Sequence, residues 1–121
     1  MRILVIDDQP GVRMTIAVVL GEGYEVVGAE SGAAGLREFA NSNFDVAIVD
    51  YFLQGIMNGR DVMMSMRERV PTLPIVAISG AAALDFLTQN SDLRNVVSLP
   101  KPFRPNELMA AIEAAIRSRT D

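Results

Sequence analysis

The chain alternates between short apolar runs rich in β-branched residues and longer stretches whose apolar residues recur at helical spacing. The short runs predict five strands, at residues 3–6, 24–27, 46–49, 75–78 and 95–97. The first, third and fourth runs are almost continuously apolar, which is typical of strands in a parallel sheet. We therefore expect these three strands to be covered on both faces.

Four apolar stripes between the strands predict amphipathic helices, and a short alanine-rich stretch at 82–89 predicts a fifth. The stripes consist of Val12, Ile16, Val19 and Leu20; Leu36, Phe39 and Ala40; Val62, Met63, Met66 and Val70; and Leu108, Ile112, Ala115 and Ile116. Capping and proline residues support these boundaries. Ser31 suits an N-cap, Pro71 and Pro74 follow the third helix, and Pro105 suits a first helical turn.

The order of the elements is strand then helix, five times over. This order predicts one α/β domain over residues 1–121, with a parallel sheet, right-handed crossovers and helices on both faces. For five strands, the usual doubly wound order is 2-1-3-4-5. A ligand crevice then lies beyond the carboxyl ends of strands 1 and 3.

Composition excludes several classes of chemistry. The 121 residues contain no cysteine and no histidine, which excludes disulfides, thiolate sites, Ser-His triads and the usual zinc sites. A net charge of -4 argues against binding of nucleic acid through charge. No apolar run approaches membrane length or resembles a signal peptide, so we expect a cytoplasmic protein.

Polar residues stand at the carboxyl ends of four predicted strands: Asp7 and Asp8, Asp50, Ser79, and Lys101. Each alone could be a helix cap or turn residue. Together they would lie on one rim of the sheet, where three carboxylates repel one another unless one is protonated or a cation lies among them. An all-oxygen site suits Mg²⁺.

The remaining groups at this rim favour phosphoryl chemistry. Lys101 is the single lysine beside ten arginines, which indicates a compact charge used for a specific contact. A hydroxyl and an ammonium opposite the carboxylates would hold an anion with several oxygens. A carboxylate flanked by Mg²⁺ and lysine can attack a phosphoryl group.

In their order and spacing, Asp7-Asp8, Asp50, Ser79 and Lys101-Pro102-Phe103 resemble the receiver domain of two-component response regulators. The resemblance extends from Arg2 to Arg117. It implies a flavodoxin-like (βα)₅ fold and a phosphoprotein that assists its own phosphorylation and dephosphorylation but is not otherwise an enzyme. The phosphoryl donor would be a histidine kinase or a phosphotransfer protein, as in a phosphorelay.

The resemblance also implies a role for each site residue. Asp50 is the phosphoacceptor, and Mg²⁺ is bound by Asp8, Asp50 and the backbone carbonyl of Phe52, with Asp7 acting through water. The phosphoryl group is bound by Ser79 and Lys101, and Gly80 gives the donor access. The Lys101–Pro102 peptide bond is expected to be cis.

The sequence departs from the family pattern at three places. Gln54 and Asn58 occupy positions that usually carry proline and glycine, and the glycine follows one residue later, at Gly59. Ser98 replaces the aromatic residue whose side chain usually changes position when the domain is phosphorylated. Bulky Phe52 and small Ala81 occupy the two positions that tune access of water to the acyl phosphate.

Three functions other than that of a phosphorylated receiver are conceivable for this sequence. A flavin- or nucleotide-binding module would need a loop rich in glycine, serine and threonine after strand 1, where Asp7 and Asp8 stand instead. An aspartate-based phosphatase would need a substrate cap, and no insertion is long enough. A degenerate receiver that only binds proteins is the alternative, which the intact acidic, hydroxyl and lysine positions disfavour.

The output of such a domain depends on the length of the native chain. If 121 residues are the whole product, the signal must leave through a protein contact, and a longer chain would carry an output domain. The face expected to bind a downstream protein or a second copy is built from the fourth helix, fifth strand and fifth helix. No contact with nucleic acid or membrane is expected through this domain.

Overall fold

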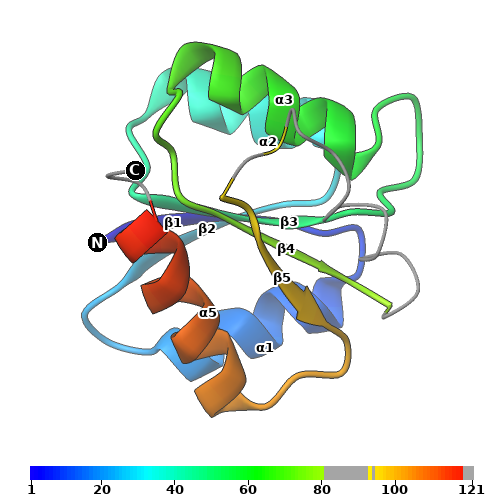
Figure 1. Ribbon diagram of the computed structural model, residues 1–121. Coiled ribbons are helices and arrows are strands. Elements are labelled where there is room, and N and C mark those ends of the chain that lie inside the picture. Colours follow the sequence, from blue (N-terminus) through cyan, green and yellow to red (C-terminus); the bar gives the residue numbers. More distant parts are fainter. Residues whose placement is uncertain (81–92, 94, 119–121) are drawn as a thin grey trace.

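The computed structural model describes residues 1–80, 93 and 95–118, and these residues form a five-stranded parallel sheet with helices on both faces (Figure 1). The strand order is β2-β1-β3-β4-β5, and every neighbouring pair is parallel. The strands are β1 (Arg2–Ile6), β2 (Glu25–Ala29), β3 (Val46–Asp50), β4 (Ile75–Ser79) and β5 (Val97–Pro100). The predicted fold class and strand order are confirmed.

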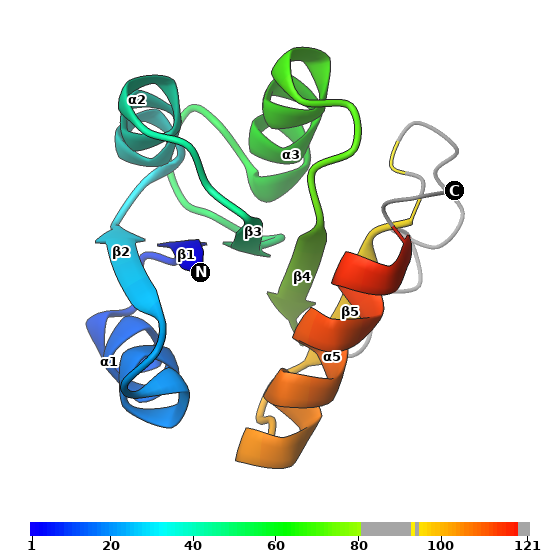
Figure 2. The same cartoon turned by 90° about the vertical axis from the view of Figure 1, so that its left-hand side faces the viewer.

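In the described part of the chain, four helices cover the sheet, two on each side. The helices are α1 (Pro10–Leu20), α2 (Gly32–Asn41), α3 (Gly59–Arg69) and α5 (Pro105–Ser118). Helices α2 and α3 lie on one face and α1 and α5 on the other, as the two views at right angles show (Figures 1 and 2). The predicted helix at 82–89 lies outside the described residues. Among the described residues, no helix is long and apolar enough to cross a membrane.

Alternation along the central strands divides the interior into two cores. Leu4 and Ile6 of β1 pack into the core beneath α2 and α3, whereas Ile3 and Val5 pack into the core beneath α1 and α5. All residues of β3 and β4 are buried. Double coverage therefore explains why these strands are almost continuously apolar, as the sequence predicts.

The edge strands differ from their predicted bounds. Strand β5 begins at Val97 instead of at Asn95, because Asn95 has a positive φ of 62° and belongs to the preceding turn. The strand continues through Pro100, which an edge strand tolerates because it need not donate to a further neighbour. Strand β2 likewise extends to Ala29, through small residues that carry little strand propensity.

The predicted helical stripes face the sheet, with two exceptions. Ala40 is exposed, and Val70 lies beyond the end of α3 with 39% of its surface exposed. The N-cap prediction is confirmed, because the Ser31 hydroxyl accepts the Ala34 amide at 3.1 Å. Pro105 is the first residue of α5, where its missing amide proton costs no hydrogen bond.

Candidate functional site

The sheet brings the polar residues that end its strands to one rim. Asp7 and Asp8 follow β1 directly, Asp50 is the last residue of β3, and Ser79 is the last residue of β4. Lys101 follows β5, and its amide donates to the Ser79 carbonyl at 2.8 Å. Parallel strands end at the same edge, so residues far apart in the chain meet there.

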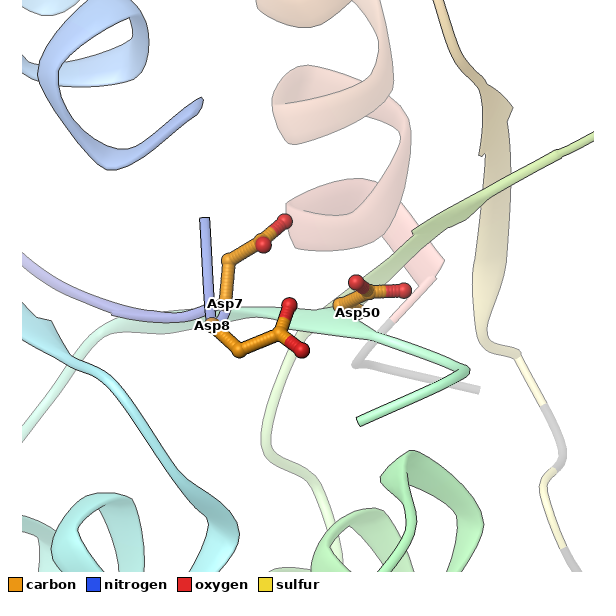
Figure 3. A group of neighbouring side chains, drawn as sticks. All are labelled: Asp7, Asp8 and Asp50. Carbon is orange, nitrogen blue, oxygen red and sulfur yellow. The ribbon is translucent and has the colours of Figure 1, made fainter. Parts of the chain in front are cut away.

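Three carboxylates gather at this rim. Asp7, Asp8 and Asp50 each offer an oxygen, and these oxygens lie within 4.8 Å of one another (Figure 3). Asp7 is fully buried, Asp50 is 5% exposed, and Asp8 is partly exposed. So dense a cluster needs positive charge to balance it.

Lys101 supplies part of that balance. Its Nζ lies 2.9 Å from Asp7 Oδ2 and 3.2 Å from Asp50 Oδ2. Among the described residues, no other donor reaches the buried Oδ2 of Asp7. The sequence predicts this ammonium opposite the carboxylates, whereas the structure places it in direct contact with two of them.

Burial and charge shift the acid–base behaviour of this pair. Burial raises the pKa of Asp7, and the Asp50 charge adds to this effect, while the Gln9 amide and Lys101 oppose it. Burial alone would lower the pKa of Lys101, but contacts with Asp7 and Asp50 outweigh it, so that pKa lies above its ordinary value. Lys101 therefore stays protonated at neutral pH.

The turn after β3 accommodates its extra residue through a close backbone contact. The Gly59 amide donates to the Tyr51 carbonyl at 3.0 Å, and a Cβ at position 59 would lie 2.6 Å from Tyr51 Cα and would also collide with the Asp50 carbonyl. Asn58 caps α3 by accepting the Asp61 amide at 2.9 Å, and the Asp61 carboxylate accepts the Asn58 amide. Glycine at 59 is thus required one residue later than the family pattern places it.

The acceptor candidate is held at both oxygens. The Phe52 amide donates to Asp50 Oδ1 at 3.0 Å, while Oδ2 contacts Lys101. The Phe52 ring is 60% exposed and meets the Tyr51 ring edge-on, with centroids 5.3 Å apart. An aromatic pair therefore directly follows Asp50 in the chain.

The other predicted positions lie near the same rim. Ser79 is buried, and Gly80 is exposed; among the described residues no heavy atom lies within 4 Å of a Cβ built at Gly80. The Lys101–Pro102 peptide bond is cis, as the resemblance implies. Ser98 is half-buried and pairs in register with Ala77. Ala81 lies outside the described residues.

Two residues at the site are missed by the sequence reasoning. Arg13 Nη1 donates to the Asp7 carbonyl at 2.7 Å. The Gln9 amide donates to Asp7 Oδ1 at 2.9 Å, and its Oε1 lies 3.5 Å from Lys101 Nζ. One signal for Arg13 was present, because it is the only charged residue in the sequence of α1.

The residues present fit a hard divalent cation. The cluster offers only oxygen atoms, and no hydrogen bond or ion pair from the described residues reaches the Asp8 carboxylate. Mg²⁺ prefers carboxylate oxygens and retains water, which the partly exposed Asp8 permits. Asp8 and Asp50 would hold such an ion, with Asp7 behind them.

Comparison with known sequences agrees with this geometry. The family model described as "Response regulator receiver domain" matches residues 3–113. The chain is 34% identical over 119 residues to the transcriptional regulatory protein KdpE of Mycobacterium tuberculosis, covering 98% of this chain and 52% of that protein. It is 32% identical over 130 residues to the DNA-binding response regulator MtrA of Mycolicibacterium smegmatis, covering 99% and 52%. The chain thus spans about half the length of these relatives.

Solved structures give the same result. A response regulator receiver domain protein from Clostridium thermocellum superposes with a TM-score of 0.84 at 29% identity, covering 98% of this chain and 96% of that one. The receiver domain of NtrX from Brucella abortus gives a TM-score of 0.84 at 28% identity, covering 96% and 98%.

Proposed function

This chain belongs to the family of response regulator receiver domains, and on that basis we propose that Asp50 accepts a phosphoryl group in a two-component signalling system. The observation that carries the proposal is the position of the Asp50 carboxylate. It lies at the end of β3, 3.2 Å from the Lys101 ammonium and inside the acidic cluster.

The transfer itself is a substitution at phosphorus. With a phosphohistidine donor, a bond forms between an Asp50 oxygen and phosphorus, the phosphorus–nitrogen bond breaks, and the imidazole leaves as a neutral ring when its other nitrogen carries a proton. The Phe52 amide and Lys101 fix the rotation of the Asp50 carboxylate, which orients it for attack. Lys101 and the Ser79 hydroxyl bind the phosphoryl oxygens, and Gly80 leaves room for the donor.

A divalent cation belongs to the same proposal. Asp8, Asp50 and the Phe52 carbonyl would bind Mg²⁺, with Asp7 acting through water. When bound, the ion supplies positive charge that offsets the repulsion between the carboxylates and an incoming phosphoryl group.

The partners follow from the family. We propose a histidine kinase or phosphotransfer protein as donor, and a downstream protein or second copy at the face that includes β5 and α5. A groove of about 440 Å³ beside the site supports the docking of a donor, and it is lined by Gly11, Val12, Thr15, Lys101, Pro102 and Phe103.

Intact-mass measurement after incubation with acetyl phosphate and Mg²⁺ tests the acceptor. We expect one added phosphoryl group in the wild type, none in Asp50→Asn, and one in Asp45→Asn, a control at an exposed aspartate just before β3. Equal labelling of Asp50→Asn would assign the phosphate elsewhere. A folded wild type that takes no phosphate would favour the degenerate receiver.

A further inference from the structure

Arg13 makes an interaction at the site that none of the expected roles includes. It lies in the first turn of α1, and it is the only charged residue of that helix. Its side chain is partly buried, and Nη1 donates to the backbone carbonyl of Asp7 at 2.7 Å. The guanidinium therefore binds the peptide that joins the two aspartates and not their carboxylates.

Strand β2 leaves room for this arrangement. Gly28 lies beside the arginine, and a Cβ built there would come within 3.3 Å of Arg13 Cδ and 3.6 Å of Nε. A side chain at position 28 would press on the arginine stem. The absence of one lets the stem pass between α1 and the edge strand to reach the end of β1.

The Asp7–Asp8 peptide controls where the Asp8 carboxylate points. Asp7 is fixed independently, because its amide donates to the Ala29 carbonyl at 3.1 Å and its carboxylate contacts Gln9 and Lys101. Among the described residues, no hydrogen bond or ion pair reaches the Asp8 carboxylate. Its direction therefore depends on the backbone, and Arg13 is the side chain that holds that backbone.

From this geometry we propose that Arg13 is a positioning residue, which orients Asp8 for binding of a divalent cation through the Asp7 carbonyl. The inference rests on the proposed function, since it assumes that Asp8 binds Mg²⁺. Loss of positioning and loss of charge predict opposite changes in Mg²⁺ affinity: loss of positioning weakens binding. A cation near the site repels Mg²⁺, so removal of charge alone would tighten binding.

The test compares Arg13→Met with the wild type. Methionine retains an unbranched apolar stem and removes the donors, and Arg37→Met on the exposed side of α2 is the matched control. Isothermal titration calorimetry with Mg²⁺ should show about tenfold weaker binding in Arg13→Met, the lower end for residues that orient metal ligands. Arg37→Met should bind as the wild type does.

A metal-free measurement separates positioning from general damage. In ¹⁵N-¹H NMR spectra without Mg²⁺, Arg13→Met should shift the amide signal of Asp8, because the Asp7–Asp8 peptide loses the hydrogen bond that anchors its carbonyl. Gly28→Val offers a second route, since it retains the charge but crowds the stem at an exposed strand position, where valine favours the fold. It should also weaken Mg²⁺ binding while unfolding at or above the wild-type temperature.

The outcomes are distinguishable. Unchanged or tighter Mg²⁺ binding in Arg13→Met would overturn the inference. If that variant does not fold, unchanged binding in Gly28→Val would overturn it instead. If the wild type itself does not bind Mg²⁺, the proposed function fails first.

Discussion

At the scale of single residues, Lys101 is the cation that contacts the acidic cluster. Its ammonium contacts both Asp7 and Asp50, and its side chain is 22% exposed. A buried ion pair contributes little to the free energy of unfolding compared with apolar residues of similar size. Removing only one partner is strongly destabilising, because the remaining buried charge is left without compensation. Lys101 thus offsets the repulsion within the acidic cluster as well as being a candidate phosphoryl ligand.

Replacement of Lys101 by methionine should destabilise the protein in a pH-dependent way. We expect Lys101→Met to lower the free energy of unfolding by about 3 kcal/mol near neutral pH. Because the pKa of Asp7 is raised in the fold, ionised Asp7 opposes folding, and the variant regains stability as pH falls and Asp7 binds a proton. Because the pKa of Lys101 is also raised in the fold, protonated Lys101 stabilises the wild type. This stabilisation is lost at high pH, when the lysine releases its proton.

Urea unfolding at about pH 7 and about pH 4.5 measures this difference. The gap between Lys101→Met and the wild type should narrow at the lower pH. Arg37→Met is the control for loss of an exposed cation and should stay near the wild type at both values. A gap that widens on acidification would contradict the electrostatic explanation.

Asp8 should behave in the opposite way to Lys101. Its carboxylate has no ion pair with the described residues, so Asp8→Asn removes a repelling charge and leaves no cation without a partner. We expect the metal-free variant to be more stable by about 1 kcal/mol, the order for like charges a few ångströms apart when water screens them, as it can at the partly exposed Asp8. A thermal melt without Mg²⁺ should show a rise of about 4 °C, and calorimetry should show weaker Mg²⁺ binding. A clear fall in the melting temperature would mean that Asp8 stabilises the fold.

At the scale of elements, the turn between β3 and α3 couples Asp50, the proposed acceptor, to a helix. Gly59 begins α3 and lies against the backbone of Asp50 and Tyr51, so the start of the helix and the end of the strand share one contact. The capping box of Asn58 and Asp61 fixes the helix end that makes this contact. The position of Asp50 therefore depends on α3 as well as on the sheet.

Gly59→Ala tests this coupling. The added Cβ would collide with backbone atoms, which cannot move aside as a flexible side chain can, and we expect a loss of about 3 kcal/mol in unfolding free energy. Gly11→Ala is the control, because a Cβ there meets no heavy atom of the described residues and alanine favours a helix. Chemical denaturation of both variants measures the difference. Equal unfolding free energies for Gly59→Ala and Gly11→Ala would show that the turn accommodates the added methyl group without cost.

The sequence predicted elements well where burial is symmetric and less well at edges. Strands β1, β3 and β4 are apolar except at one terminal residue each (Arg2, Asp50 and Ser79), because two helical layers cover them, and their patterns predict them closely. The bounds of β5 depend instead on pairing with β4 and on the positive φ of Asn95, which apolar patterning does not encode. The gathering of the aspartates and Lys101 at one rim was predictable, because the carboxyl ends of parallel strands lie at the same edge of a sheet. Arg13 stands out as the only charged residue of α1 and Gly59 as the displaced glycine, but residue type does not say which backbone atoms each of them contacts.

At the scale of the whole molecule, the two cores leave one polar rim at which strands from all parts of the chain end. The edge strand β5 connects this rim to the face proposed for downstream contacts. In β5, Ser98 pairs with Ala77, so both positions carry small side chains. Serine lacks the bulk of the aromatic residue that relays phosphorylation in the resembled pattern.

We therefore expect phosphorylation to reach the outer face without a side-chain switch at position 98. NMR shift mapping with beryllofluoride as the phosphoryl mimic should show changes at Ser79 and Gly80 that Ser98→Ala leaves intact. The serine hydroxyl can remain solvated in both states at little cost, so its loss has no consequence for coupling. Loss of the activation shifts beyond β4 in Ser98→Ala, or a rotamer change at Ser98, would contradict this expectation.

Tyr51, whose ring meets that of Phe52 edge-on, directly follows Asp50 and is one of the two tyrosines of the chain. The chain has no tryptophan and two tyrosines, so its near-ultraviolet emission comes from Tyr24 and Tyr51. Tyr24 precedes β2 and Tyr51 follows β3, which places them at opposite ends of the parallel sheet. In Tyr24→Phe, fluorescence would arise from the residue next to Asp50 alone. A change in that emission on addition of Mg²⁺ would then report, without a dye or a label, on the end of the sheet that carries the proposed acceptor.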